Sequence, residues 1–287
     1  MFIQDLPRIN TSAPITSFQT DTLKLLRTLG VHEEHLAQSE LTAFDWSRIS
    51  VHMVTSRPGM VSLSNRENSI GLAALAHAVR PFVHSACTFE CVGSSLGALE
   101  KPWLEDAMCC FQGRLPISST VKSQKRRGPS ESRPDYSNIP VKIVFPTMTY
   151  VLESPEGPGG FGTLFCQSKN WDNPNCPHSL FHRCESCCGE GRALHCKIIT
   201  ATTVDGDEPA WWYVGSANFT PSAWGKFVKE KSAVMVANYE LGVVFGAQQA
   251  AQLCPAGFPF PYHRPLQAYT AEDAPWMQEM ARIFEFR

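Results

Sequence analysis

The sequence contains no apolar run long enough to cross a bilayer, and its first ten residues, MFIQDLPRIN, lack the charged and then apolar pattern of a secretory leader. It also lacks an excess of charge of either sign, because 25 Lys and Arg stand against 27 Asp and Glu for a net charge of −2. A nearly neutral chain has no global field that attracts nucleic acid. We therefore expect no membrane partner, and we expect any contact with nucleic acid to depend on local patches.

The eleven cysteines do not indicate a disulfide framework, because their number is odd and no leader pattern precedes them. Reduced thiols inside a cell are the simpler interpretation. One segment has zinc-like C-x2-C spacing with histidines nearby, but a second paired set of ligands is absent. We expect loop thiols and predict neither a metal nor a cofactor, with a metal site as the alternative. The residues concerned are Cys176, His178, His182, Cys184, Cys187 and Cys188.

The stretch between residues 195 and 225 concentrates the chemistry of the chain. His195 and Lys197 stand two apart beside Ile198 and Ile199, a period-2 pattern that predicts a strand with both polar side chains on one face. The intervening Cys196 would then point to the opposite face, as a core thiol rather than a nucleophile. Residues 205–209 have the composition of a hairpin loop, and residues 211–214 predict a second, buried strand.

After that second strand the sequence predicts a tight turn and a helix start. Gly215 to Asn218 form the turn, Thr220 has the features of an N-cap, and Pro221 suits the first helical position. Asn218 thus stands just before a helix N-terminus, a place that favours anions. An imidazole can donate or accept a proton near neutrality, while an ammonium and an amide can hold phosphoryl oxygens. Together they make half of a phosphoryl-transfer site that needs no metal.

These motifs resemble a known family. H-x-K followed by G-S-x-N is similar to a half-site of the phospholipase D superfamily. The longer strings GSANFTPSAWG and YELGVVF resemble the second half-site of the tyrosyl-DNA phosphodiesterases. Many phospholipase D motifs carry an aspartate five residues after the lysine, where this chain has Thr202. That departure favours the tyrosyl-DNA phosphodiesterase branch, whose half-sites use asparagine.

The resemblance implies an α/β fold, a phospholipase D-like mixed sheet flanked by helices that forms one of two pseudo-symmetric halves. It implies a nuclear DNA-repair enzyme that hydrolyses 3′-phosphotyrosyl bonds at DNA ends carrying a covalently bound peptide. His195 would be the general acid and base, and Lys197 and Asn218 would stabilise charge on the phosphoryl oxygens. Glu240 would hydrogen-bond a histidine nitrogen and fix its tautomer.

The resemblance also implies three DNA-binding residues. The loop after residue 92 matches a G-S-L-G string that holds a DNA phosphate in the relatives; here it reads Ser94-Ser95-Leu96-Gly97, with Ser94 in place of a glycine. Small residues of this kind can form a nest of backbone N–H groups for an anion, although a plain turn is the simpler interpretation. Lys169 falls near a K-x-N-W position that faces the groove in the relatives.

The printed sequence holds one H-x-K motif, at residues 195–197. We expect residues 1–18 to be a remnant of the family's N-terminal half and linker, and residues 19–287 to be the C-terminal catalytic half-domain. Because the attacking histidine of the family belongs to the other half, we expect little phosphodiesterase activity from this chain alone. Two alternatives remain open. One is a homodimeric phosphodiesterase or nuclease that completes its site with a second copy, and the other is a non-catalytic remnant that binds DNA ends.

Other periodic segments predict the surrounding elements. We expect helices at 20–29 and 69–82, a central strand at 141–145, and strands at 233–236 and 239–245 in one sheet. Residues 113–139 have the composition of a surface loop. This segment contains a short basic run. The run is either a solvated part of the loop or a signal for nuclear localisation or DNA contact. It consists of Lys122, Lys125, Arg126 and Arg127.

Overall fold

The computed structural model of the chain describes residues 5–9, 15–38, 41–64, 68–117, 134–189, 191–204, 209–254 and 257–280. Two predicted features, the basic run near residue 125 and most of the hairpin loop at 205–209, lie outside these residues. Within the described ranges, none of the helices is both long and apolar enough to pass through a bilayer.

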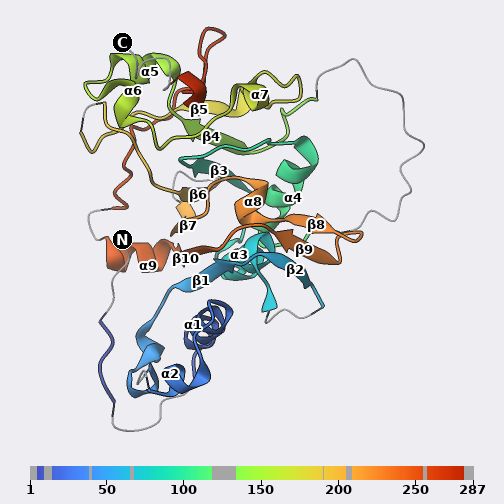
Figure 1. Cartoon of the computed structure of the whole chain (residues 1–287), viewed down its shortest axis with the longest axis vertical. Coiled ribbons are helices and arrows are strands. Elements are labelled where there is room, and N and C mark those ends of the chain that lie inside the picture. The colour runs from blue at the N-terminus through green and yellow to red at the C-terminus, as the bar shows by residue number, and fades with distance from the viewer. Residues whose placement is uncertain are drawn as a thin grey trace.

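A seven-stranded mixed sheet forms the body of the molecule (Figure 1). Its β3–β4 and β4–β5 pairs are parallel and its other pairs are antiparallel. This is the mixed sheet flanked by helices that the resemblance implies. In spatial order the strands are β1 (His52–Ser56), β10 (Glu240–Gly246), β7 (Pro209–Gly215), β6 (Ile198–Thr203), β3 (Cys87–Val92), β4 (Val141–Phe145) and β5 (Phe181–Arg183).

Both faces of this sheet are buried, which is why its central strands are apolar at successive positions rather than at alternate ones. Phe89 and Trp211 face the larger core, where they pack with the helix α4 (Lys101–Phe111). On the other face, Val92 and Ile198 pack with Tyr262, and Trp212 stacks on Phe245 and Phe258. The aromatic run at 211–213 is therefore divided between two cores.

The ends of several helices follow local capping rules. Thr16 caps the first helix through a hydrogen bond from the Gln19 N–H to its hydroxyl, and Thr147 caps α5 in the same way. Proline occupies the first turn of α4 and of α8, where its missing N–H costs nothing. The helices other than α4 are α1 (Ser17–Thr28), α2 (Glu33–Gln38), α3 (Gly71–Val79), α5 (Met148–Glu153), α6 (Gly157–Gly160), α7 (Ser168–Trp171), α8 (Pro221–Trp224) and α9 (Ala247–Leu253), with 3-10 turns at Leu41–Ala43, Trp46–Arg48, Arg80–Phe82 and His178–Leu180.

A second, three-stranded sheet has the order β2 (Gly59–Ser62), β9 (Ala233–Val236), β8 (Lys226–Val228). The prediction that 233–236 and 239–245 share one sheet is therefore wrong. The two strands are close in the chain, yet β9 pairs with β2 and β8 while β10 pairs with β1 and β7. The pairing partner of each strand decides its sheet membership, and local periodicity does not record which strand that partner is.

Most predicted elements are present, with shifted ends. The helix predicted at 20–29 begins at Ser17, so the domain boundary predicted after residue 18 falls inside α1. The helix predicted at 69–82 is α3 followed by a 3-10 turn, and the strand predicted at 141–145 is β4. Frayed and capped ends are the least periodic parts of a helix, which explains the shifts.

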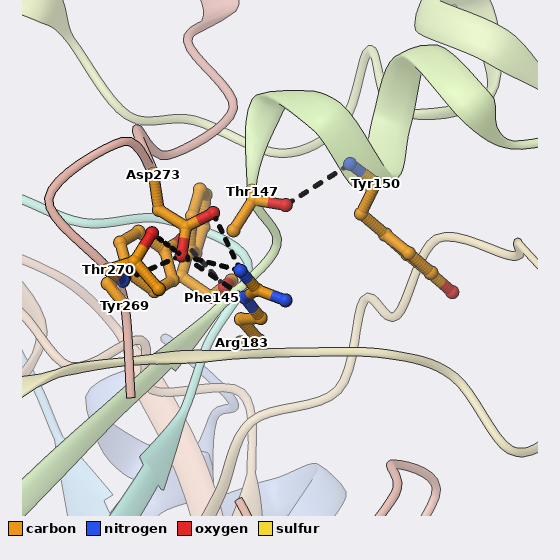
Figure 2. A network of polar contacts seen from close by, with 7 residues as sticks. All are labelled: Phe145, Thr147, Tyr150, Arg183, Tyr269, Thr270 and Asp273. Carbon is orange, nitrogen blue, oxygen red and sulfur yellow. Dashed lines mark hydrogen bonds and ion pairs between the residues drawn. The ribbon is translucent and has the colours of Figure 1, made fainter. Parts of the chain in front are cut away.

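A strap of residues 257–277, called the C-terminal strap below, crosses the β4–β5 end of the main sheet. Figure 2 shows its anchor: Arg183 of β5 donates to both carboxylate oxygens of Asp273, at 3.0–3.2 Å. Thr270 donates its N–H and its hydroxyl to the same carboxylate, at 2.7 and 3.1 Å. The hydroxyl of Tyr269 donates to the Phe145 carbonyl at 2.8 Å. The strap is thus fixed to β5 by charge-assisted bonds and to β4 by a neutral hydrogen bond.

Replacing this carboxylate tests the anchor. Burial acts to raise the pKa of Asp273, but the hydrogen bonds from Thr270 and Arg183 hold this pKa below its ordinary value. A depressed carboxyl pKa stabilises the fold above the unfolded-state pKa, and this stabilisation is lost as pH falls below about 4. We expect Asp273→Asn to lower the free energy of unfolding at pH 7 by about 1–2 kcal/mol. Urea unfolding across pH 3–7 measures this difference, which should narrow at the acid end.

The control is the neighbouring exposed carboxylate, Glu272. Glu272→Gln should leave both the unfolding free energy and its pH dependence as they are in the wild type. Equal stabilities of Asp273→Asn and the wild type at pH 7 would show that the strap is held by its packing alone.

Candidate active site

Strand topology brings three separate segments of the chain to one place. β6 lies between β3 and β7 and is antiparallel to both, so the start of β6 adjoins the ends of both neighbours. His195 and Lys197 lie just before β6, Ser94 follows β3, and Asn218 follows β7. The sheet therefore gathers an imidazole, an ammonium, a hydroxyl and an amide at one edge.

The predicted strand through His195 and Lys197 is shorter than expected, because β6 begins at Ile198. The segment still runs beside the end of β7, since the N–H of Gly215 donates to the Lys197 carbonyl at 3.2 Å. The two polar side chains also meet as predicted. The ammonium of Lys197 lies 3.1 Å from Nδ1 and 3.3 Å from Nε2 of His195.

The ammonium of Lys197 is saturated with acceptors. It donates to Ser94 Oγ at 2.6 Å and to the carbonyl of His195 at 3.0 Å, and its third contact is the imidazole ring. Its similar distances to both ring nitrogens show that it is not aligned with the lone pair of either one. The side chain is 7% exposed, whereas His195 is exposed to solvent. The ammonium is thus a buried, fixed charge beneath an accessible ring.

Asn218 is held by its side-chain oxygen. Oδ1 accepts from the N–H of Ser94 at 2.8 Å, from the N–H of Ser95 at 3.0 Å and from the Ser94 hydroxyl at 3.2 Å. An NH₂ group could not accept these bonds, so the amide orientation is determined. Nδ2 is therefore turned away from this loop, as a donor available to a ligand.

The same contacts revise the expectation for the Ser94–Ser95 loop. Its backbone N–H groups do form a nest, and the oxygen that fills it is Oδ1 of Asn218. Ser94 is 1% exposed, whereas Ser95 is partly exposed and lines a groove. DNA contact by Ser95 stays a prediction, and Ser94 belongs to the interior of the site.

The pKa values of His195 and Lys197 are both below their ordinary values. Burial, and then the charge of Lys197, lower the pKa of His195 below its ordinary value. Burial lowers the pKa of Lys197, and the carboxylate of Glu240 acts in the opposite direction. His195 is therefore mainly neutral at pH 7 and ready to accept a proton. An anion such as a phosphate would offset the lysine charge and so favour the acid form.

The turn that carries Asn218 is supported from below by Tyr213. The Tyr213 hydroxyl accepts from the N–H of Ala217 at 3.2 Å, and Thr220 caps α8 by accepting from the N–H of Ala223, also at 3.2 Å. The N-cap and the proline start of this helix are confirmed. However, α8 has four residues, so it is too short for a strong helix dipole. The position of Asn218 owes more to the nest and to Tyr213 than to the helix.

Glu240 begins β10 near the same edge. Its carboxylate accepts from Ser216 Oγ at 2.5 Å and from Asn238 Nδ2 at 3.2 Å. Among the hydrogen bonds of the described residues, none joins Glu240 to a histidine, so the tautomer-fixing role stays a prediction. Ser216, which also accepts from the N–H of Leu241 at 2.9 Å, is a supporting residue that sequence reasoning missed. Its place inside the G-S-x-N string is the signal that could have found it.

Lys169 and the cysteine-rich segment stand apart from this cluster. Lys169 is exposed on α7, and no contact of the described residues links it to His195 or Asn218. Within the described ranges, no three His, Cys, Asp or Glu side chains are arranged to hold a metal ion. Burial raises the pKa of Cys196 to about 11 and that of Cys176 to about 12, which makes these thiols poor nucleophiles.

A groove of about 740 Å³ opens from the amide of Asn218. It runs from Ser95 past α8 to β8 and β9, where Lys226 and Met235 line it. Met235 is 50% exposed, and it lies between Met60 and Lys226 in the register of the small sheet. The groove is thus continuous with the polar cluster, and its lining includes the cationic side chain of Lys226 and the apolar side chain of Met235.

With this geometry in view, the chain can be compared with known proteins. The sequence profile of the tyrosyl-DNA phosphodiesterase family matches residues 4–270. The chain belongs to the tyrosyl-DNA phosphodiesterase family. It is 27% identical over 292 residues to tyrosyl-DNA phosphodiesterase 1 of Drosophila melanogaster, which covers 92% of this chain and 47% of that relative. The protein of the same name from Arabidopsis thaliana is 28% identical over 208 residues, 70% of this chain and 31% of that relative.

The chain therefore spans about half or less of the length of these two family members. A solved structure of yeast tyrosyl-DNA phosphodiesterase superposes with a TM-score of 0.68 at 19% identity, over 95% of this chain and 68% of that one. This match confirms the predicted fold class. The family resemblance drawn from H-x-K, GSAN and YELG is likewise confirmed.

Proposed function

We propose that this chain supplies the acid–base half of a phosphodiesterase that removes tyrosyl peptides from DNA 3′ ends. The observation that carries the proposal is the convergence of His195, Lys197 and Asn218, which are joined through Ser94 by contacts of 2.6–3.3 Å. Membership of the tyrosyl-DNA phosphodiesterase family supports the substrate class. A nuclear location follows from that role as part of the same proposal.

In the proposed reaction the phosphodiester lies against Lys197 and the Nδ2 of Asn218, which stabilise charge on its non-bridging oxygens. A nucleophilic histidine attacks phosphorus and forms a covalent phospho-histidine, while His195 protonates the leaving tyrosyl oxygen. Neutral His195 then removes a proton from water, and the resulting hydroxide attacks phosphorus and releases the nucleophile. The printed sequence has one H-x-K motif, so the nucleophile is proposed to come from another polypeptide segment.

The depressed pKa of His195 gives this proposal a pH signature. The base step needs neutral imidazole, which persists to lower pH than for an ordinary histidine. The acid step needs imidazolium, whose fraction in the free chain is already small at pH 7. In a completed enzyme we therefore expect kcat/KM to decline as pH rises through the depressed pKa of His195, so that the decline begins below neutrality, and we expect the His195→Asn variant to lose that dependence.

The direct test uses a single-stranded oligonucleotide with a 3′-phosphotyrosyl end. We expect the 287-residue chain to bind this end more tightly than the same oligonucleotide with a 3′ hydroxyl, and to release no tyrosine on its own. Fluorescence anisotropy measures binding, and gel separation of products measures cleavage. Equal affinity for both oligonucleotides would overturn the proposal.

The homodimer alternative has a distinct outcome. If two copies of His195 share one site, the chain alone cleaves the substrate, its specific activity rises with concentration, and light scattering reports a dimer. Mixing with His195→Asn chains would then reduce activity in proportion to the mixed dimers formed. A monomer without activity that still binds the 3′-phosphotyrosyl end supports the half-site proposal.

A further inference from the structure

Ser94 occupies an unusual position in the site, because it contacts both of the groups proposed to hold phosphate. Its hydroxyl lies 2.6 Å from the Lys197 ammonium and 3.2 Å from the Asn218 carboxamide oxygen. It is 1% exposed, and among the residues that line the adjoining groove Ser95 is present and Ser94 is not. Ser94 thus reaches a ligand only through its two neighbours.

The direction of each bond follows from the donor inventory. An ammonium has hydrogens and no acceptor, so Lys197 must donate to Ser94 Oγ. The single hydroxyl hydrogen of Ser94 is then free for the Asn218 oxygen, which accepts it beside two backbone N–H groups. The relay therefore runs one way, from Lys197 through Ser94 to Asn218. In this arrangement both ends have fixed orientation, and Nδ2 of Asn218 is turned outwards.

The quality of the three lysine contacts differs. The bonds to Ser94 Oγ and to the His195 carbonyl are 2.6 and 3.0 Å long, whereas the imidazole contact is spread over both ring nitrogens. The imidazole contact is consequently the one that an incoming phosphoryl oxygen would replace. Ser94 and the carbonyl would meanwhile keep the ammonium in place.

We propose that Ser94 is a positioning residue that locks the Lys197 ammonium and the Asn218 amide into their phosphate-binding orientation through a serine relay. The inference rests on the proposed function for the identity of the ligand, and on the geometry of the described residues for the relay itself. Ser94 makes no contact with the phosphate. Ser94 stands in place of the glycine of the G-S-L-G string. A glycine has no side chain, so it could not link Lys197 to Asn218 in this way.

The test compares Ser94→Ala with the wild-type chain by NMR, using lysine labelled at the side-chain ε carbon to follow the titration of Lys197. Removal of an acceptor from a buried ammonium disfavours the charged form, so the pKa of Lys197 should fall further in Ser94→Ala. The affinity for inorganic phosphate, measured by calorimetry, should fall by about tenfold, the usual scale for one charge-assisted bond. Ser94→Thr keeps the hydroxyl and should restore both values.

Ser95→Ala is the matched control for the titration, since the backbone N–H of Ser95 serves the nest while its hydroxyl makes no contact with Lys197 among the described residues. It should leave the pKa of Lys197 unchanged. If Ser94→Ala does not fold, Ser94→Cys carries the same comparison, because a thiol has a similar shape and is a weak acceptor. A lysine titration and a phosphate affinity equal to the wild type would overturn the relay.

The experiments distinguish a failure of the proposed function from a failure of the Ser94 relay. A wild-type chain that does not bind phosphate contradicts the proposed function, while the Lys197 titration still decides whether Ser94 controls the ammonium. A wild-type chain that binds phosphate with the same affinity as Ser94→Ala supports the proposed function and rejects the relay. A lower thermal stability of Ser94→Ala with no change in the Lys197 pKa would show a structural role only.

Discussion

Lys197→Met is expected to abolish most phosphate binding while leaving the fold intact. The buried ammonium is the charge beneath the His195 ring, and methionine has a similar length without that charge. Loss of a charge-assisted contact should weaken the affinity for inorganic phosphate by about 10–100-fold. Methionine leaves the Ser94 hydroxyl and the His195 carbonyl without the donor that Lys197 supplies, so we expect the free energy of unfolding to fall by about 1–2 kcal/mol, which a folded chain can tolerate.

The same variant should change the titration of its neighbour. Burial, and then the charge of Lys197, depress the pKa of His195, so removal of the charge should raise that pKa part of the way to its ordinary value. Two-dimensional NMR of the imidazole protons against pH measures this shift. The control is Lys101→Met, because Lys101 lies on α4 with its ammonium 4.0 Å from Glu105. A His195 pKa that falls or does not move in Lys197→Met would refute the proposed coupling.

Gly242→Ala is expected to damage both the fold and the site through a single added methyl group. Gly242 lies in β10 opposite Gly215 of β7, and the ring of Tyr213 crosses both glycines. A Cβ at residue 242 would overlap the carbons and the hydroxyl of that ring. Because Tyr213 is 1% exposed, it has no space into which to retreat. We expect the free energy of unfolding to fall by about 2–3 kcal/mol or more.

The Gly242→Ala substitution should also weaken phosphate binding at the site. A displaced Tyr213 loses the bond from the Ala217 N–H, and the turn that carries Asn218 loses its support. We therefore expect weaker phosphate binding even at temperatures where Gly242→Ala is folded. Gly159→Ala is the matched control, since nothing lies within 4 Å of its Cβ position on α6. Urea unfolding and calorimetry measure the two effects, and equal unfolding free energies for both variants would contradict the steric argument.

Sequence reasoning identified the site residues more securely than their partners. His195, Lys197 and Asn218 were recognised from spacing and residue type, and the structure brings them together. The family resemblance implies a DNA-phosphate contact for Ser94, and the structure adds that its hydroxyl links Lys197 to Asn218. Spacing alone cannot show this, because residues 94, 197 and 218 meet only after β3, β6 and β7 have paired.

Some structural predictions failed for the same reason. The periodic segments at 233–236 and 239–245 are both strands, but they belong to different sheets. Each strand carries its own pattern of buried side chains, and that pattern is compatible with more than one partner. Tyr213 gave no functional signal in the sequence either, because its role depends on two glycines that leave room for its ring.

By itself, the sequence determined which residues can do chemistry and where the strands, turns and helix caps lie, since these follow from residue type and local spacing. The tertiary structure alone decided that the Asn218 oxygen fills the backbone nest of Ser94 and Ser95, that Lys197 is a saturated buried cation and that Ser94 joins Lys197 to Asn218. Hydrogen bonds over more than a hundred residues of separation fix those orientations. Such bonds form only once sheet pairing has placed distant segments within about 3 Å of one another.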